Sequence, residues 1–308
     1  MNISNHKMIV TVIICTYDRS HLLRRALSSL VHQTLKPDQF EIIVVDDGSR
    51  DETPTVCEML RKKLPHLRYI STGSNLGLAH ARNVGIKAAS GNYIIFTDDD
   101  CIPATDWLER LCADLDRAPI VAGAVTSPVN NYMKLCHNIS SFHAYMPGRK
   151  SNTTPFIAGA NMGFHRRVLE ELRGFQNSLR IAQDIELILR ARHSGLKILF
   201  SPNAIVLHDP ERTTVASIFR HTFKHAAVTI SLRNRYRSLL RTPFILRSAP
   251  LLLLLAPLIA LKVTFQIYLS NVNIAKLFWT APLVYMLKIT WCLGAYRGLR
   301  SGRGLKKE

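Results

Sequence analysis

The sequence contains no pair of cysteines spaced as C-x-x-C, although it has six cysteines among its 308 residues. Zinc sites and small disulfide-bonded domains usually depend on closely spaced cysteines, so both classes are excluded as the basis of this chain. Isolated cysteines are typical of a reducing compartment, where they pack as small apolar side chains. The chain therefore depends on a hydrophobic core, and its length suffices for one or two domains.

The N-terminus also lacks the pattern of a secretory signal. One Lys precedes Met8, and the short apolar stretch that follows runs directly into the polar residues 16–19. A signal peptide instead has a basic start, a longer apolar centre and a small-residue cleavage site. We therefore expect no secretion by this route, and we give little weight to the N-x-S/T triplets at Asn138 and Asn152.

Acidic residues are scarce in the last third of the chain. From Glu211 onward the sequence has 16 Lys and Arg but only two acidic residues, Glu211 and Glu308, a balance of +14 out of the total of +18. The first 210 residues therefore carry only about +4. A nearly neutral body with a basic tail indicates a catalytic domain followed by a segment that faces a polyanion, either nucleic acid or an anionic membrane surface.

In the first hundred residues, short apolar runs alternate with stretches of helical periodicity. Continuous apolar runs rich in β-branched residues are typical of strands that are covered on both faces. Strands alternating with helices at this spacing predict an α/β fold with a twisted, mostly parallel sheet. The predicted strands are residues 8–15, 40–45, 67–70 and 93–100, and the predicted helices end near residues 32, 64 and 89.

The last of these runs ends in three consecutive carboxylates, Asp98, Asp99 and Asp100. Asp98 and Asp100 share one face of an extended segment, and like charges so close together repel unless a cation lies between them. A divalent ion such as Mg²⁺ would meet this need, because it prefers carboxylate oxygens and substrate phosphates. The alternative is an ordinary acidic loop before a helix that begins near Thr105 and Asp106.

Polar residues also follow the other predicted strands. Thr16 and Tyr17 follow the first strand, and Asp46 and Asp47 follow the second. Ligands of such sheets bind outside the carboxyl ends of the strands. A single Asp-Asp-Gly-Ser segment often makes an ordinary turn. Three polar loops at neighbouring strand ends instead predict one binding edge.

The ordered set of motifs resembles the family 2 glycosyltransferases, which have the GT-A nucleotide-sugar-binding fold. The resemblance covers residues 8–210 and would make residues 1–210 a GT-A catalytic domain. It implies an inverting transfer of one sugar from a nucleotide-diphosphate sugar. The matching segments are residues 16–17, 45–49, 75–77, 81–85, 98–100, 159–164, 184–187 and 206–208.

The resemblance also implies roles for individual residues. The donor would be bound by Thr16, Tyr17, Asp46, Asp47, Arg82, Asp98, Asp99 and Asn161. Asp46 and Asp47 would contact the base and ribose, and Arg82 the diphosphate, unless Arg82 forms an internal salt bridge instead. Asn161 would line the sugar pocket, although an Asn in a Gly-rich strand can also mark a bulge.

Two further roles follow from the same resemblance. A divalent metal, Mn²⁺ or Mg²⁺, would be held by Asp98 and Asp100, with His208 as third ligand or diphosphate contact. Asp184 would take the proton from the acceptor hydroxyl, with Glu186 as an alternate, unless Asp184 only caps a helix. Gln183 stands where the family more often has Glu.

The basic tail divides into two predicted parts. Residues 211–247 form a basic amphipathic linker helix, and residues 248–308 form a membrane-associated region. Two apolar stretches, residues 248–269 and 277–296, are long enough to cross a bilayer, and the basic residues at their outer ends would place both ends in the cytoplasm. Helices that lie in the plane of the membrane are the alternative, and nucleic-acid binding is disfavoured by the Leu251–Leu255 run.

Together these features predict a transferase at the cytoplasmic face of the cell membrane. The acceptor would be a saccharide or a lipid-linked molecule of the cell envelope or of a polysaccharide, and polyprenyl phosphate is one alternative. The Gln-x-x-Arg-Trp motif of processive relatives is absent, which favours addition of a single sugar. A non-catalytic adaptor that binds a nucleotide or polyanion is the other alternative. Residues 125–155, which are irregular and aromatic, would contact the acceptor or form a plain loop.

Overall fold

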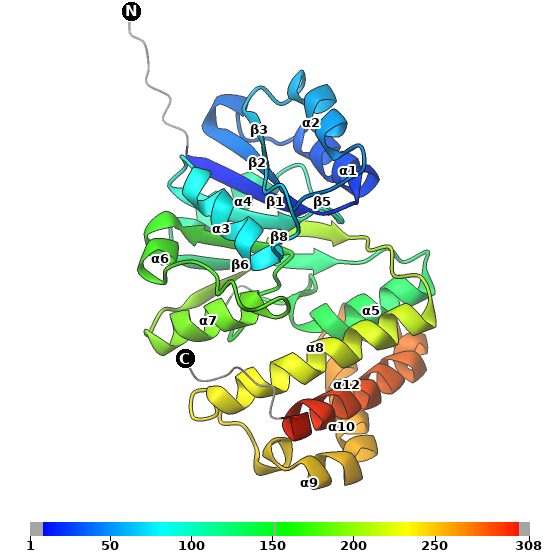
Figure 1. Cartoon of the computed structure of the whole chain (residues 1–308). Helices are drawn as coiled ribbons and strands as arrows, with labels where there is room; N and C mark the ends of the chain where they lie inside the picture. The colour runs from blue at the N-terminus through cyan, green and yellow to red at the C-terminus, as the bar shows by residue number, and fades with distance from the viewer. Residues whose placement is uncertain (1–8, 151, 302–308) are drawn as a thin grey trace, which may run out of the picture. The chain divides into compact units, whose positions relative to one another are not determined.

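The computed structural model describes residues 9–150 and 152–301, which form two compact units (Figure 1). Within the described residues, unit 1 comprises residues 9–126 and 150–209, and unit 2 comprises residues 127–149 and 210–301. The sequence predicted a division at residue 210. Residues 127–149 were predicted to belong to the catalytic domain, but in the structure they belong to unit 2. The predicted domains also included residues 1–8 and 302–308, which lie outside the described residues.

Unit 1 is built on one eight-stranded sheet with the strand order β3-β2-β1-β4-β7-β6-β8-β5. Its strands are β1 (Val10–Thr16), β2 (Phe40–Asp46), β3 (Leu67–Ser71), β4 (Tyr93–Asp98), β5 (Cys101–Pro103), β6 (Ile120–Thr126), β7 (Asn161–His165) and β8 (Ile198–His208). Its helices are α1 (Ser20–Leu30), η1 (Pro37–Gln39), α2 (Thr53–Arg61), α3 (Leu78–Ala88), α4 (Trp107–Leu115), α6 (Arg166–Glu171) and α7 (Gln183–His193).

The first half of the sheet is parallel, as the sequence predicted. β1 pairs in parallel with β2 and β4, and β2 pairs in parallel with β3. Every residue of β1 and β2 is buried, which is the environment that continuous apolar runs require. The prediction of alternating strands and helices in this half is confirmed.

The second half of the sheet is mixed, so the prediction of a mostly parallel sheet is wrong there. β7 enters between β4 and β6 and runs antiparallel to both, and β5 runs antiparallel to β8. Only β6 and β8 pair in parallel in this half, with a register shift after Gly123. Unit 1 is therefore an α/β unit with a mixed sheet.

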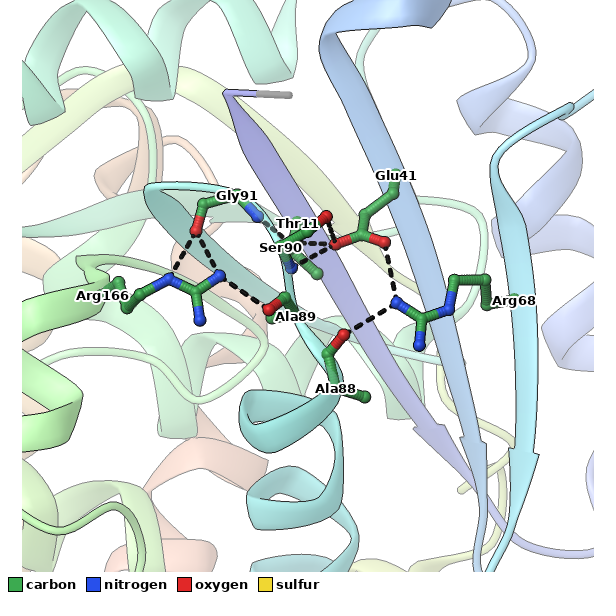
Figure 2. A network of polar contacts seen from close by, with 8 residues as sticks. All are labelled: Thr11, Glu41, Arg68, Ala88, Ala89, Ser90, Gly91 and Arg166. Carbon is green, nitrogen blue, oxygen red and sulfur yellow. Dashed lines mark hydrogen bonds and ion pairs between the residues drawn. The ribbon is translucent and has the colours of Figure 1, made fainter. Parts of the chain in front are cut away.

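A polar network fixes the loop that leads into β4 (Figure 2). The buried Glu41 carboxylate accepts hydrogen bonds from Thr11 Oγ1 at 2.7 Å, Ser90 N at 2.6 Å and Arg68 Nη1 at 3.1 Å. Arg166 donates to the carbonyl oxygens of Ala89 and Gly91 on the other side of the same loop. Burial raises the pKa of Glu41, but the hydrogen bonds from Ser90, Thr11 and Arg68 outweigh it and lower the pKa below its usual value, so the buried carboxylate stays ionised. The network holds the start of the strand that carries Asp98 at its end.

Unit 2 is helical. It contains α5 (Tyr132–Phe142), η2 (His143–Tyr145), α8 (Val215–Arg235), η3 (Phe244–Arg247), α9 (Ala249–Leu254), α10 (Ala256–Leu269), α11 (Val272–Ala275), η4 (Phe278–Thr280) and α12 (Ala281–Ser301). The segment predicted to be irregular over residues 125–155 contains one α-helix, α5, whose apolar face packs in a cluster with residues of α10 and α12.

The predicted linker helix is α8, which packs along α12 within unit 2. Two glycines of α12 allow this close approach, since a Cβ on Gly294 or Gly298 would lie 2.3 Å from a backbone carbonyl oxygen of α8. Small residues spaced four apart commonly let two helices meet backbone to backbone. Residues 211–247 therefore belong to the body of this unit.

The two predicted membrane spans are not found as spanning helices. Residues 248–269 are divided between α9 and α10 at Leu255, and residues 277–296 are divided between η4 and α12. Across residues 9–150 and 152–301, no helix has both the length and the apolar character that crossing a bilayer requires. α12 is long, but Lys288 and Arg297 lower its hydropathy.

Candidate active site

The carboxyl ends of β1, β2 and β4 meet at one edge of the sheet, as expected from the sequence. Thr16 pairs with Asp46, and Cys15 pairs with Asp98, so the polar residues that follow these strands are neighbours in space. Thr16 is buried and its Oγ1 donates to Asp99 Oδ2 at 2.8 Å. Tyr17 is 41 % exposed at the same edge.

Asp46 and Asp47 are buried and hold the surrounding loops. Asp46 accepts hydrogen bonds from Ser49 N at 2.8 Å and from the Tyr69 hydroxyl at 2.5 Å. Asp47 accepts from the backbone N–H groups of Leu76 and Gly77 at 2.9 and 2.8 Å. Asp46 thus fixes its own turn to β3, and Asp47 fixes the loop between β3 and α3. Each carboxylate can accept about four hydrogen bonds, so capacity for a ligand remains.

Gly48 lies between these carboxylates and the same loop. Its φ of +85° is in the left-handed region, and a Cβ there would lie 2.7 Å from backbone atoms of Ser74. Only glycine meets both conditions without moving the loop. The Asp-Asp-Gly-Ser segment is therefore a tight turn whose carboxylates face inward.

Arg82 is buried and does not face solvent. Its Nη2 lies 3.1 Å from Asp98 Oδ1 and 3.2 Å from the carbonyl oxygen of Gly159. Its guanidinium also lies 5.9 and 5.3 Å from the ring centroids of Phe96 and Phe175. The internal salt bridge is therefore the observed arrangement, and the geometry does not support the predicted contact of Arg82 with a diphosphate.

Asp99 and Asp100 share a second arginine, Arg19. Its Nε lies 3.2 Å from Asp99 Oδ2, and its Nη1 lies 3.7 Å from Asp100 Oδ2. Burial raises the pKa of Asp99 to about 7, although the Arg19 guanidinium opposes this shift. The other oxygen of Asp99, Oδ1, is buried without a hydrogen-bond partner. An unsatisfied buried carboxylate oxygen is costly, so Asp99 suits a site that receives a further polar group.

His208, at the end of β8, reaches the same carboxylates. Its Nε2 lies 3.6 Å from Asp100 Oδ1, because His208 and Cys101 are paired in the antiparallel register of β8 and β5. A carboxylate with an imidazole suits Mn²⁺ better than Mg²⁺, because Mg²⁺ prefers oxygen ligands throughout. Asp100 and His208 therefore fit as two ligands of a divalent ion, whereas Asp98 faces Arg82.

A complete protein ligand set is not assembled in this geometry. Among residues 9–150 and 152–301, no three His, Cys, Asp or Glu side chains come together as a metal site would require. The predicted set of Asp98, Asp100 and His208 is thus only partly brought together. A site with two protein ligands leaves positions for substrate phosphate oxygens, as Mg²⁺ sites commonly do.

Asp184 lies in the first turn of α7, beside the segment that Arg82 holds. A Cβ on Gly159 would lie 2.6 Å from Asp184 Oδ2, so the carboxylate rests against the glycine backbone. Ala182, two residues earlier, has a left-handed backbone with φ 61° and ψ 26°, which costs about 1 kcal/mol for a residue with a Cβ. Such strained positions cluster at functional sites. Glu186, the alternate candidate for the base, is buried, and its Oε1 lies 2.8 Å from Arg190 Nε.

Asn161 has a structural position. It is fully buried, its Oδ1 accepts from Trp107 Nε1 at 2.9 Å, and its Nδ2 donates to the carbonyl oxygens of Ala124 and Ala204 at 2.8 and 2.9 Å. A Cβ on Gly123 would lie 2.2 Å from Asn161 Nδ2, so Gly123 makes room for the amide. Asn161 joins β6 and β8 where their register shifts, and this geometry does not support the predicted place in a sugar pocket.

Two residues of the site, Arg19 and Gly159, received no role from the sequence, although Gly159 lies in the matching segment 159–164. Arg19 follows the Thr16-Tyr17-Asp18 loop directly, so its position after β1 was a signal that it lies at the same edge. Gly159 lies two residues before β7 in a loop, and no local pattern indicated that its carbonyl oxygen and Cα would join Arg82 to Asp184.

Comparison with known proteins gives a consistent result. The profile of Glycosyl transferase family 2 matches residues 11–173, and that of Glycosyl transferase family group 2 matches residues 93–293. The chain is 26 % identical over 201 residues to the glycosyltransferase AglE of Haloferax volcanii, covering 65 % of this chain and 66 % of that one. It is also 26 % identical over 214 residues to the pre-mycofactocin glycosyltransferase of Mycobacterium tuberculosis, covering 65 % and 42 %. The matches thus span less than two thirds of either relative.

Solved structures share the fold. The mannosyltransferase PcManGT from Pyrobaculum calidifontis, in complex with GDP-Man and Mn²⁺, aligns with a TM-score of 0.63 at 22 % identity over 91 % of this chain and 85 % of that chain. Residues 1–349 of S. aureus TarS align with a TM-score of 0.55 at 19 % identity over 96 % and 91 %. At these identities the likeness concerns the fold alone.

Proposed function

Because the chain belongs to Glycosyl transferase family 2 and has the GT-A-like fold, we propose that it transfers one sugar from a nucleotide-diphosphate sugar with inversion. The single observation that carries this proposal is the convergence at one sheet edge. The buried carboxylates at the ends of β2 and β4 lie there, and Arg82 links Asp98 to the glycine beside Asp184. A donor at this edge would place its sugar between the carboxylates of β4 and Asp184.

The donor nucleotide would lie at the loops that follow β1 and β2. Tyr17 offers an exposed ring at this edge, and Asp46 and Asp47 retain acceptor capacity for hydroxyl or N–H groups. Asp99 Oδ1, which has no partner, could accept a hydrogen bond from the donor. Arg82 would act indirectly by fixing Asp98.

Loss of the nucleoside diphosphate leaves negative charge on its terminal phosphate. A divalent ion bound by Asp100 and His208 would supply electrophilic stabilisation of that charge. Arg19, which contacts Asp99 and Asp100 and is partly exposed, would add a positive charge at the same place. The complex of PcManGT with GDP-Man and Mn²⁺ supports this assignment by analogy.

Inversion requires removal of the acceptor proton on the face of the sugar opposite the leaving group. Asp184 suits this role because it is only partly buried beside Gly159, whereas Glu186 is buried and engaged by Arg190. We assign the acceptor to the class of saccharides or lipid-linked molecules of the cell envelope or of a polysaccharide. The strongly basic unit 2 favours a place at the cytoplasmic face of an anionic membrane.

The proposal is tested by incubating the full chain with Mn²⁺ and a panel of UDP-, GDP- and dTDP-sugars and measuring release of nucleoside diphosphate. We expect release from at least one donor, at a rate that falls by about a hundredfold or more in Asp184→Asn once an acceptor is supplied. Asp106→Asn is the matched control, since Asp106 lies just before α4 with a side chain that is 39 % exposed. Absence of release with every donor, in the presence of membrane extract as acceptor source, would favour the non-catalytic adaptor.

A further inference from the structure

The outer face of α9 and α10 carries a continuous row of exposed apolar side chains. Their spacing of four, three, four and four residues places them on one side of a helix. At the break between the two helices, Leu255 N donates to Leu251 O of α9 and Leu255 O accepts from Ile259 N of α10, both at 2.9 Å, so Leu255 joins the ends of the two helices. These side chains are 46–84 % exposed. They are Leu254, Leu258, Leu261, Phe265 and Leu269, and we call them the apolar row.

The opposite side of α10 is used for packing inside unit 2. Ala256, Ala260, Thr264 and Ile267 are buried there, and the helix packs against α12. α10 is therefore apolar around its whole circumference, with Lys262 as its one charged residue. A helix of this composition in water normally has both sides covered, and the apolar row therefore needs a second apolar environment.

Further exposed apolar side chains follow α10 in the sequence. Val272, Phe278 and Trp279 are all more than half exposed. The Trp279 ring stacks on Tyr132, with the ring centroids 5.4 Å apart. Indole and phenol rings are typical of the boundary between lipid tails and water, since one end of each ring is apolar and the other can be hydrated.

The charge of unit 2 identifies the partner. Its segments contain 18 Lys and Arg but only two acidic residues, Glu211 and Glu308. Lys262 and Lys276, on α10 and just after α11, are exposed near the apolar row in sequence. A second copy of the chain bound at this face would bring two strongly positive surfaces together, whereas anionic lipid headgroups would neutralise them.

We infer that the apolar row is a membrane-docking face, on which α9 and α10 lie in the plane of an anionic lipid surface. The Leu and Phe side chains would enter the boundary between headgroups and acyl chains, and the lysines would bind the headgroups. This inference builds on the membrane location proposed above and names the surface responsible for it. It does not depend on sugar transfer, because docking requires no donor.

Sedimentation with lipid vesicles tests this inference without any nucleotide sugar. The full chain is mixed with vesicles of equimolar phosphatidylglycerol and phosphatidylcholine, or of phosphatidylcholine alone. We expect binding to the anionic vesicles that weakens at high salt and falls by about tenfold or more in the double variant Leu258→Gln/Phe265→Gln. Met59→Gln/Val129→Gln, which replaces two exposed apolar side chains outside the apolar row, should bind as the unchanged chain does.

Three results would overturn the inference. The unchanged chain could fail to bind anionic vesicles, or the apolar-row variant could bind as well as its control. Alternatively, sedimentation velocity could show a dimer that only the apolar-row variant dissociates, which would make a second copy the partner. Thermal unfolding of both variants checks that each folds, and donor hydrolysis measured in parallel separates loss of docking from loss of transfer.

Discussion

Arg82 Nη2 contacts both Asp98 Oδ1, at 3.1 Å, and the carbonyl oxygen of Gly159, at 3.2 Å. One buried guanidinium therefore joins the end of β4 to the glycine against which Asp184 lies. The two halves of the proposed reaction, departure of the diphosphate and removal of the acceptor proton, are thereby held at a fixed separation. Arg82 is a positioning residue in this account.

Arg82→Lys should lower kcat for transfer by about tenfold or more, because a misplaced catalytic group can cost that much without loss of charge. Arg82→Met should in addition lower the free energy of unfolding by about 2 kcal/mol. This loss is smaller than the loss expected on breaking a fully buried ion pair, because the Asp98 side chain is partly exposed. Steady-state kinetics and urea denaturation measure these effects. Wild-type kcat in Arg82→Lys would show that the geometry is not maintained by Arg82.

Gly159→Ala should reduce kcat by about tenfold while leaving the affinity for the donor nucleotide unchanged. The added methyl would lie 2.6 Å from Asp184 Oδ2 and must displace that carboxylate. Gly195→Ala is the matched control: its φ of +80° makes alanine destabilising, but no atom lies within 4 Å of the new methyl. Unchanged kcat in Gly159→Ala would argue against Asp184 as the base.

Asn161→Ala should destabilise the protein by about 3 kcal/mol or more, because Trp107 Nε1 and two carbonyl oxygens lose their partner in the core. The exposed Asn152→Ala should change stability by less than about 0.5 kcal/mol. Chemical denaturation compares the two variants. If Asn161→Ala were as stable as wild type and had a raised KM for the donor, Asn161 would belong to the sugar pocket after all.

Lys288 provides a test of pH dependence in unit 2. Its Nζ donates to the carbonyl oxygen of Ser140 at 2.6 Å, and burial lowers its pKa from 10.5 to about 8. Below pH 8 the amine is charged in both states, so the folded state carries the full cost of a buried cation. Between about pH 8 and 10.5 only the unfolded state binds the proton, so this cost disappears as the pH rises.

The difference in unfolding free energy between Lys288→Met and wild type should therefore change in favour of wild type between pH 7 and pH 10.5, by on the order of 1–3 kcal/mol. Using the difference removes the opposing contribution of the buried cysteines that do not interact with Lys288, whereas Cys292, which does, is replaced by Ala in both proteins. Guanidinium denaturation across this range is the measurement. A difference that stays constant with pH would mean that the Lys288 amine is well hydrated.

The parallel half of the sheet was predictable because its strands are continuous apolar runs. Val10–Thr16 and Phe40–Asp46 are buried along their whole length, and such strands have few alternative environments. The polar edge followed from the same reasoning, since parallel strands place their carboxyl ends together. Thr16, Asp46 and Asp98 are neighbours for this reason.

The side-chain directions at that edge were not predictable from the sequence. Arg82 faces Asp98 and two phenylalanine rings because the segment around Gly159, far along the chain, approaches it. Asn161 is engaged by Trp107 and by carbonyl oxygens of two other strands. Both arrangements depend on long-range packing, which local patterns do not contain.

Hydropathy alone also gave the wrong helices in unit 2. The Leu251–Leu255 run and the apolar residues of α12 are as apolar as parts of a membrane span, but burial against a neighbouring helix requires the same composition. The contacts of Gly294 and Gly298 with α8 arise from packing within unit 2. The break at Leu255 lies just before Pro257, which has no N–H to continue the helix.

The most direct test of the account is the Mn²⁺-dependent turnover of the preferred donor by Asp100→Ala. Asp100 lies 3.6 Å from His208 Nε2 and 3.7 Å from Arg19 Nη1, and the exposed Asp106→Ala serves as control. We predict that turnover falls by about a hundredfold or more in Asp100→Ala, and that Mn²⁺ affinity measured by calorimetry with the nucleoside diphosphate falls with it. Unchanged turnover and unchanged Mn²⁺ affinity would contradict the account.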